Sequence, residues 1–240
     1  MDRHTRKELK TDKFAQGVGS GFEFLSHHRG QATRWALIGL GVVVVVAGIW
    51  LYRSHQATVR ADLLAKAMQI DDAVVGPPQP PRLNFPTPED KEKARIAAFT
   101  EVAAKYPGSS EGAIAQFALA AAQVDKGQMD ESLKTFKAIA DTAPAPYDSV
   151  AQLSMAQIYQ SQGKTADAEK LLRQLVDKPT VFVSKEQATL ELAKVLTKSK
   201  PAEARKLLEP LSASPRTSVS RAAVAAMATI PATPAPAQSN

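Results

Sequence analysis

The chain has 240 residues, of which 44% are hydrophobic and 22% are charged, the composition of a folded protein with one or two domains. It contains no cysteine, so disulfides, thiol catalysis and cysteine-ligated zinc are excluded. The net charge is +6, yet half of it lies in the first 34 residues and no nucleic-acid recognition motif accompanies it, so no nucleic-acid partner is expected.

Residues 1–34 form a basic tail that holds seven Lys and Arg against four Asp and Glu. Apolar residues recur at helical spacing between Phe14 and Leu25, which is compatible with a short interfacial helix or with an irregular tail. His27 and His28 are adjacent and have no third ligand nearby, so no metal site is expected there.

Residues 35–52 are predicted to form a transmembrane helix in contact with membrane lipid. No charged residue interrupts the run from Trp35 to Leu51, whose 17 residues would span about 26 Å of a roughly 30 Å hydrocarbon core. Trp35, Trp50 and Tyr52 lie at its ends, where amphipathic rings prefer the interface.

The flanking charge predicts how this helix is oriented. Seven Lys and Arg precede it, and only Arg53, Arg60 and Lys66 follow within about 20 residues. The bias predicts a single-pass protein of the cell inner membrane, with a cytoplasmic N-terminus and a periplasmic C-terminal part. A cleaved signal peptide is disfavoured because 34 residues precede the apolar run.

Residues 53–75 carry helical spacing and are predicted to form a linker helix. A Pro-rich stretch follows over residues 76–88. Its prolines forbid a helix and lack the donors of a sheet, so we expect a semi-rigid extended loop. Pro88-Glu89-Asp90 then opens a helix, with its acids at the positive end.

A 36-residue repeat dominates the rest of the chain. Five positions of one unit return in the next, and three of them return again after another 36 residues; they are Ala120, Gly127, Ser132, Phe136 and Ile139, then Ala156, Gly163, Ala168, Leu172 and Leu175, then Ala204, Leu208 and Leu211. Each unit indicates a helix, a turn with glycine or proline, and a second helix that ends near proline. Small alanines let the two helices approach, and bulky residues fill the space around them.

This pattern resembles the tetratricopeptide repeat (TPR). The second unit matches best, through Met155, Ala156, Tyr159, Gly163, Ala168, Leu172 and Pro179. The first unit departs from the pattern at Gln123 and Ser132, and the third uses Pro201 where the turn glycine is usual. Phe99, Val102 and Tyr106-Pro107 look like the second helix of a further unit whose first helix would lie around Val59 to Met68.

We therefore predict an all-α fold with one N-terminal transmembrane helix followed by a TPR-like α-solenoid of helical hairpins. The TPR-like domain would cover residues 89–230, with a closing helix from Thr217 to Ile230. Residues 231–240 are rich in proline and alanine and are expected to be disordered.

A broader resemblance covers nearly the whole chain. The opening RKELKTDKFA, the EFLSHHR before the span, the single span and the degenerate repeats look like the YfgM-type family. That resemblance implies an ancillary subunit of the SecYEG translocon that works beside periplasmic chaperones, with those proteins or exported chains as partners.

No catalytic motif is visible in the sequence. There is no HExxH, GxSxG or P-loop, and all four histidines lie before residue 56. We expect a protein-binding scaffold rather than an enzyme, with no cofactor and no metal.

The first helices of TPR units line a groove that binds peptides or helices. By that repeat geometry, nine residues are candidates for the groove: Ile114, Phe117, Ala121 and Val124 in the first unit, Leu153, Gln157 and Gln160 in the second, and Leu190 and Lys194 in the third. The apolar ones would equally well pack against the extra helix. The weak charge and partly apolar character of the set favour apolar segments of unfolded or helical partners.

Two other functions compete with an adaptor that binds exported chains. The protein would coordinate cell-envelope machinery by self-association, as a homo-oligomer, or it would signal across the membrane through its cytosolic tail.

Overall fold

The computed structural model describes residues 29–77 and 80–231, and the predicted basic tail up to residue 28 and the C-terminal tail from residue 232 lie outside the described residues. The described part holds nine helices and one pair of short strands. The chain divides into two compact units, one ending at Val59 and one beginning at Arg60.

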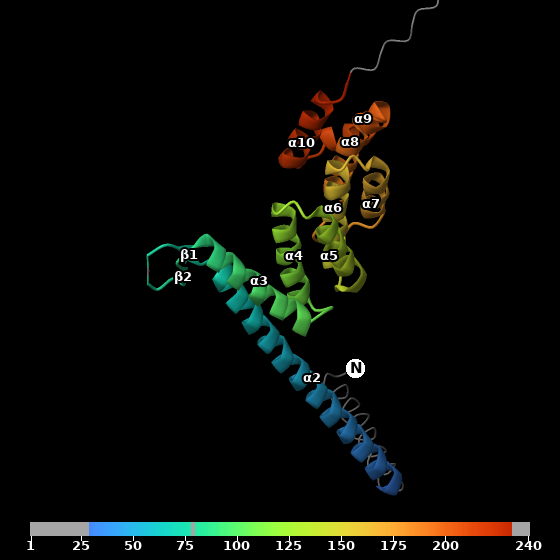
Figure 1. Cartoon of the computed structure of the whole chain (residues 1–240). Coiled ribbons are helices and arrows are strands. Elements are labelled where there is room, and N and C mark those ends of the chain that lie inside the picture. The colour runs from blue at the N-terminus through green and yellow to red at the C-terminus, as the bar shows by residue number, and fades with distance from the viewer. Residues whose placement is uncertain (1–28, 78–79, 232–240) are drawn as a thin grey trace, which may run out of the picture. The chain divides into compact units, whose positions relative to one another are not determined.

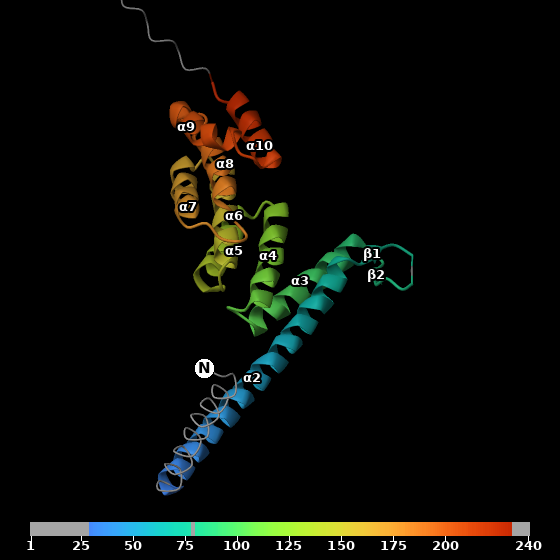
Figure 2. The ribbon, with the colours of Figure 1, turned by 180° about the vertical axis from the view of Figure 1, so that it is seen from behind.

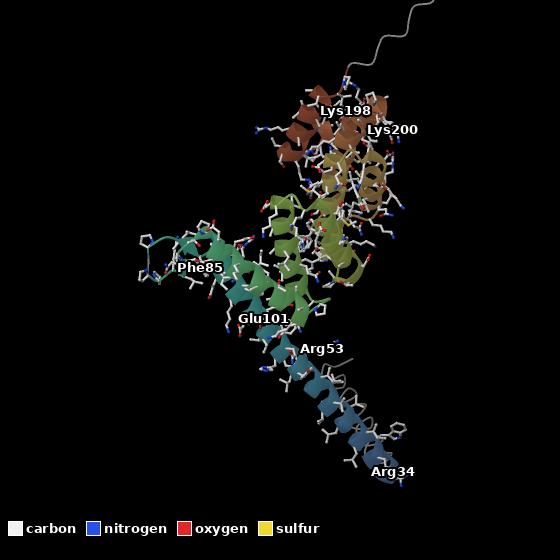
Figure 3. The ribbon with its side chains drawn as sticks, in the orientation of Figure 1. Arg34, Arg53, Phe85, Glu101, Lys198 and Lys200 are labelled. Atoms are coloured by element: carbon white, nitrogen blue, oxygen red, sulfur yellow. The ribbon has the colours of Figure 1, made fainter. Side chains whose placement is uncertain are left out.

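The long helix α2 runs from Arg29 to Asp71 and contains the predicted span. Within the described residues it is the one helix long and apolar enough to cross a membrane. Arg34 and Arg53 bracket its uncharged stretch (Figure 3), and the large apolar side chains between them are exposed, Val44 for example by 63%. No helix break separates the predicted span from the predicted linker helix.

A short parallel strand pair closes the Pro-rich segment. β1 (Val74–Val75) pairs with β2 (Asn84–Phe85), and Figure 3 labels Phe85 at this pairing. The expectation that this segment takes no part in a sheet is therefore wrong. The reason is that the backbone N–H groups of Val74 and Gly76 donate to the carbonyls of Leu83 and Phe85, at 3.0 Å each, so the Pro-rich side need only accept.

Eight further helices follow in the described residues. Figures 1 and 2 show their arrangement from opposite sides. The first helix is α3 (Pro88–Lys105) and the last is α10 (Thr217–Ala228). Between them lie three helical hairpins: α4 (Ser110–Asp125) with α5 (Met129–Thr142), α6 (Tyr147–Ser161) with α7 (Thr165–Asp177), and α8 (Lys185–Leu196) with α9 (Pro201–Ser212). This arrangement is the predicted TPR-like solenoid, including its closing helix.

Local signals set the helix ends. Thr87 and Ser109 cap α3 and α4 because their hydroxyl oxygens accept the backbone N–H groups of Asp90 and Gly112, at 3.1 and 3.0 Å. Gly127 and Gly163 end the first helices of two units with φ of 72° and 74°, the left-handed conformation that side chains disfavour. In the third unit, Pro201 starts α9 at its first turn, where a missing N–H costs nothing.

The core runs through the stack as three clusters of buried side chains. The predicted small residues Ala120, Ala156, Ala168 and Ala204 are at most 1% exposed. Ser132 occupies the position of the second-helix alanine and is fully buried, because its hydroxyl donates to the Ala120 carbonyl at 3.0 Å.

The predicted further unit at the N-terminal end of the stack is also present. Leu64 and Ala67, in the last part of α2, pack with Phe99 and Val102 of α3 in one buried cluster. The ion pair between Arg60 Nε and Glu111 Oε2, at 3.2 Å, ties the same part of α2 to α4.

Candidate protein-binding groove

Three helices line one cavity: α4 and α6, which are the first helices of the first and second units, and α5, which is the second helix of the first unit. Its volume is about 410 Å³, and its lining comes from the end of α4, the start and middle of α5, and the second half of α6: Ala121, Val124, Asp125, Met129, Phe136, Ser154, Gln157, Ile158 and Ser161.

Three of the predicted groove residues come together in this cavity. Ala121 and Gln157 are exposed at its rim, and Val124 is half-buried in its wall. The floor is apolar, because Phe136 and Ile158 belong to the buried cluster between the first and second units.

The other six predicted residues lie elsewhere. Leu153 is only 6% exposed and belongs to the core of the second and third units, where the half-buried Leu190 also packs. Ile114 packs against the cluster formed by α2 and α3, and the ring of Phe117 lies tilted against that of Phe136, with centroids 5.6 Å apart. The remaining two are exposed outside the cavity, namely Gln160 and Lys194.

Six lining residues were not among the sequence candidates, and part of this set carries a signal in the sequence. Ser154 and Ser161 stand three residues before and four residues after Gln157, so the three share one helix face. Asp125 follows Val124 on the exposed side of α4. By contrast, Met129 and Phe136 come from the second helix, and helical periodicity within α4 or α6 does not indicate them.

The lining combines an apolar floor with a polar rim. The hydroxyls of Ser154 and Ser161 donate to the carbonyls of Val150 and Ile158, at 3.0 and 2.8 Å, which leaves their oxygen lone pairs as acceptors. Among the described residues, the amide of Gln157 makes no side-chain hydrogen bond, so it can both donate and accept. Such a lining can hold a large apolar side chain and hydrogen-bond the backbone beside it.

A charge network joins α7 to the start of α9, and none of its residues lines this cavity. Glu169 of α7 accepts from Lys200 Nζ at 2.8 Å and from Arg173 Nη2 at 2.7 Å, and Arg173 also pairs with Glu203 of α9. The hydrogen bonds from Lys200 and Arg173 hold the pKa of Glu169 below its usual value. In the described residues, no group of three or more acidic or histidine side chains is placed to hold a metal ion.

Comparison with protein families decides the relationship. The family model for the tetratricopeptide repeat-like domain matches residues 30–181, which is more than half of the chain. The chain belongs to this family. The match begins at residue 30, so the family domain includes the apolar helix α2 as well as the first two hairpins.

No curated protein matches this chain. Two solved structures are similar to it: the nearly identical TPR-like repeats of a candidate kinesin light chain from Podosopora anserina, and a single-substitution form of the same protein. Each is 20% identical, covers 58% of this chain and 77% of the other, and has a TM-score of 0.48. TPR-like domains bind protein partners, and this chain has the scaffold of that class.

Proposed function

We propose that this TPR-like protein is an adaptor that is anchored in the cell inner membrane and binds apolar segments of other polypeptides through the cavity between α4, α5 and α6. The observation that carries the proposal is the cavity lining, with its apolar floor and the free amide of Gln157 at its rim. The floor would take one large apolar side chain of a partner, and the Gln157 amide would hydrogen-bond the partner's backbone.

The apolar stretch of α2 supports a location of the adaptor at the membrane. The uncharged stretch of α2 has exposed apolar side chains along its length, as lipid contact requires. Membrane confinement raises the effective concentration of the scaffold at a membrane partner. The resemblance to the YfgM-type family favours the SecYEG translocon, periplasmic chaperones or exported chains as partners, with the C-terminal part in the periplasm.

Site-specific photocrosslinking in intact membranes tests this function. A photoreactive amino acid at Gln157, on the rim, is compared with the same amino acid at Lys170, which is exposed on α7. We expect crosslinks from position 157 to a translocon subunit or an exported chain, and none above background from position 170. Equal yields at both positions would contradict the groove assignment.

A matched pair of glutamate substitutions at exposed alanines tests whether the cavity binds the partner. Ala121→Glu places a charged side chain at the rim, and Ala166→Glu places the same side chain on an exposed position of α7. The first variant should lower the crosslinking yield from position 157 by about tenfold, the consequence of losing roughly 1.4 kcal/mol of binding free energy, and the second should leave it unchanged. Crosslinks to a second copy of this chain alone would instead favour a structural coordinator that acts by self-association.

A further inference from the structure

The start of α6 and the α7–α8 connection lie side by side. The α5–α6 connection leads into Tyr147 of α6, whose ring meets that of Phe182, in the α7–α8 connection, edge to face with centroids 5.3 Å apart. The hydroxyls of Ser149 and Thr180 are 2.7 Å apart and join the same two segments. The start of α6 and the α7–α8 connection therefore form one continuous surface.

The α7–α8 connection holds apolar side chains in water. Thr180 N–H donates to the Val183 carbonyl at 2.9 Å, and Val183 N–H donates back to the Thr180 hydroxyl at 3.1 Å. The side chain of Val183 is buried in the hydrophobic core and anchors the turn there. At its tip, Val181 is 87% exposed and Phe182 is 49% exposed. A turn held by this many contacts presents its apolar tip in a defined position, which is characteristic of an interaction site.

A cavity of about 410 Å³ opens beside this turn. It is lined by the start of α6, the end of α7 and the α7–α8 connection: Asp148, Ser149, Gln152, Gln174, Leu175, Asp177, Lys178 and Thr180. This cavity shares no lining residue with the groove between α4, α5 and α6.

Asp148 brings an unmatched acceptor to the cavity. Its Oδ1 atom is shielded from solvent and has no hydrogen-bond partner among the described residues. A shielded carboxylate oxygen without a donor is unfavourable, and a water molecule or a ligand group that donates a hydrogen bond relieves it. Lys178 lines the same cavity, yet the described ion pairs do not include it with Asp148.

The charge of the lining selects a cation. Two carboxylates, Asp148 and Asp177, face one ammonium, Lys178, so the lining has a formal charge of −1. A guanidinium group suits such a lining, because its planar set of N–H donors pairs with carboxylate and amide oxygens, which Asp148, Gln152 and Gln174 supply here.

We propose that this surface is a second docking site, for a polypeptide segment that carries an arginine beside a large apolar residue. The arginine enters the cavity and donates to Asp148, and the apolar side chain packs on Val181 and Phe182. The site works independently of the groove, so one scaffold holds two segments of a partner or two partners at once.

Peptide binding to the full chain in lipid nanodiscs tests the proposal. The probe is a dye-labelled peptide, Gly-Ser-Arg-Leu-Leu-Gly with blocked ends, and its matched control carries citrulline in place of arginine. Fluorescence anisotropy should show saturable binding of the arginine peptide and about tenfold weaker binding of the citrulline peptide, since a charge-assisted hydrogen bond is lost. Equal affinities would overturn the proposal.

Variants of the protein locate the binding. Asp148→Asn should weaken the arginine peptide by about tenfold. Asp167→Asn, which also changes an aspartate in the first turn of a helix, should have no effect. Val181→Ser, at a position too exposed to disturb folding, should weaken the peptide as well. Ala121→Glu in the groove should leave it unchanged, so failure of this proposal is separable from failure of the groove. Identical affinities for the two asparagine variants would overturn it.

A membrane role for the apolar turn is the competing outcome. Because the chain has no cysteine, Val181→Cys can be labelled selectively with an environment-sensitive dye. We expect water-like emission in nanodiscs that contain phosphatidylglycerol, and a blue shift when the arginine peptide is added. A blue shift before any peptide is added would show lipid contact and would overturn the proposal.

Discussion

Glycines in this scaffold act through two different physical effects. Gly127 ends α4 with φ of 72°, and the space where its Cβ would lie is empty. Gly112, in the first turn of α4, has an ordinary φ, but a Cβ there would lie 2.0 Å from the carbonyl oxygen of Tyr106. Gly127 is therefore required by the left-handed backbone conformation, and Gly112 by the close approach of the Tyr106 backbone.

The two effects predict different costs. Gly112→Ala should lower the free energy of unfolding by about 3 kcal/mol, because the backbone of the α3–α4 connection must move. Gly127→Ala should lower it by about 1 kcal/mol, the strain of a left-handed alanine. Urea unfolding of the full chain in detergent, followed by circular dichroism, measures both. A larger loss for Gly127→Ala would contradict the packing role of Gly112.

Sequence periodicity identified the packing residues better than the binding residues. Ala156 and Ala168 each have an alanine 36 residues away, Ala120 and Ala204 respectively, because each helix crossing demands a small side chain. Both Ala156 and Ala168 are buried. The nine groove candidates obey no such steric demand. One helix face holds both core and exposed residues, so Leu153 and Gln157, four residues apart, differ completely in exposure. The groove itself stays a prediction.

At the scale of the element, α10 covers the last hairpin. Ala223 is fully buried against the core formed by α8 and α9, and its neighbour Ala222 is exposed. Solenoids require such a terminal element because the last repeat has no successor to cover its apolar face.

This neighbour pair gives a controlled test of the cap. Ala223→Leu should destabilise the protein by about 2 kcal/mol, because the three extra heavy atoms of leucine cannot be placed at a packed helix crossing without overlap. Ala222→Leu adds the same side chain to the surface and should change stability by less than about 0.5 kcal/mol. The midpoint of thermal unfolding compares them, and equal shifts would show that α10 does not pack as described.

The ion network between α7 and α9 makes stability depend on pH. Hydrogen bonds from Lys200 and Arg173 lower the pKa of Glu169 in the folded protein. In the unfolded chain a glutamate has a pKa of about 4.3. Ionised Glu169 therefore stabilises the fold above that pH, and the contribution is lost as the pH falls through the folded pKa. Glu169→Gln should cost about 1 kcal/mol at pH 7 and progressively less below pH 4.

Urea unfolding between pH 3 and pH 7 measures this difference. Glu101→Gln is the control, because within the described residues Glu101 forms one ion pair, with Lys105 one turn along α3 at 2.6 Å, and both side chains are exposed. Figure 3 labels Glu101 and Lys200, the lysine that contacts Glu169. A pH-independent cost for Glu169→Gln would contradict the network.

At the scale of the whole molecule, the decisive question is on which side of the membrane the hairpins lie. Since the chain lacks cysteine, Ala222→Cys is a unique thiol on an exposed part of α10. A membrane-impermeant maleimide should label it in spheroplasts without lysis, and the protein should stay in the membrane pellet after alkaline washing. Labelling that requires lysis would contradict a periplasmic solenoid.

The sequence by itself determined the fold class, the repeat and the candidate span. Steric demands at helix crossings and turns restrict residue type, so Ala168, Gly163 and Pro201 are visible one residue at a time. The uncharged run from Trp35 to Leu51 is equally direct, because 17 residues without a charge cover most of a bilayer core.

Only the tertiary structure decided where surfaces form. The strand pair that closes the Pro-rich segment depends on hydrogen-bond partners nine residues apart, and the cavities combine side chains from three segments each. Local periodicity reports which face of a helix is apolar, not which neighbour covers it. Asp148 and Val181 are ordinary residues in the sequence, and they become a candidate docking site because the packing of α6 against α7 brings them together.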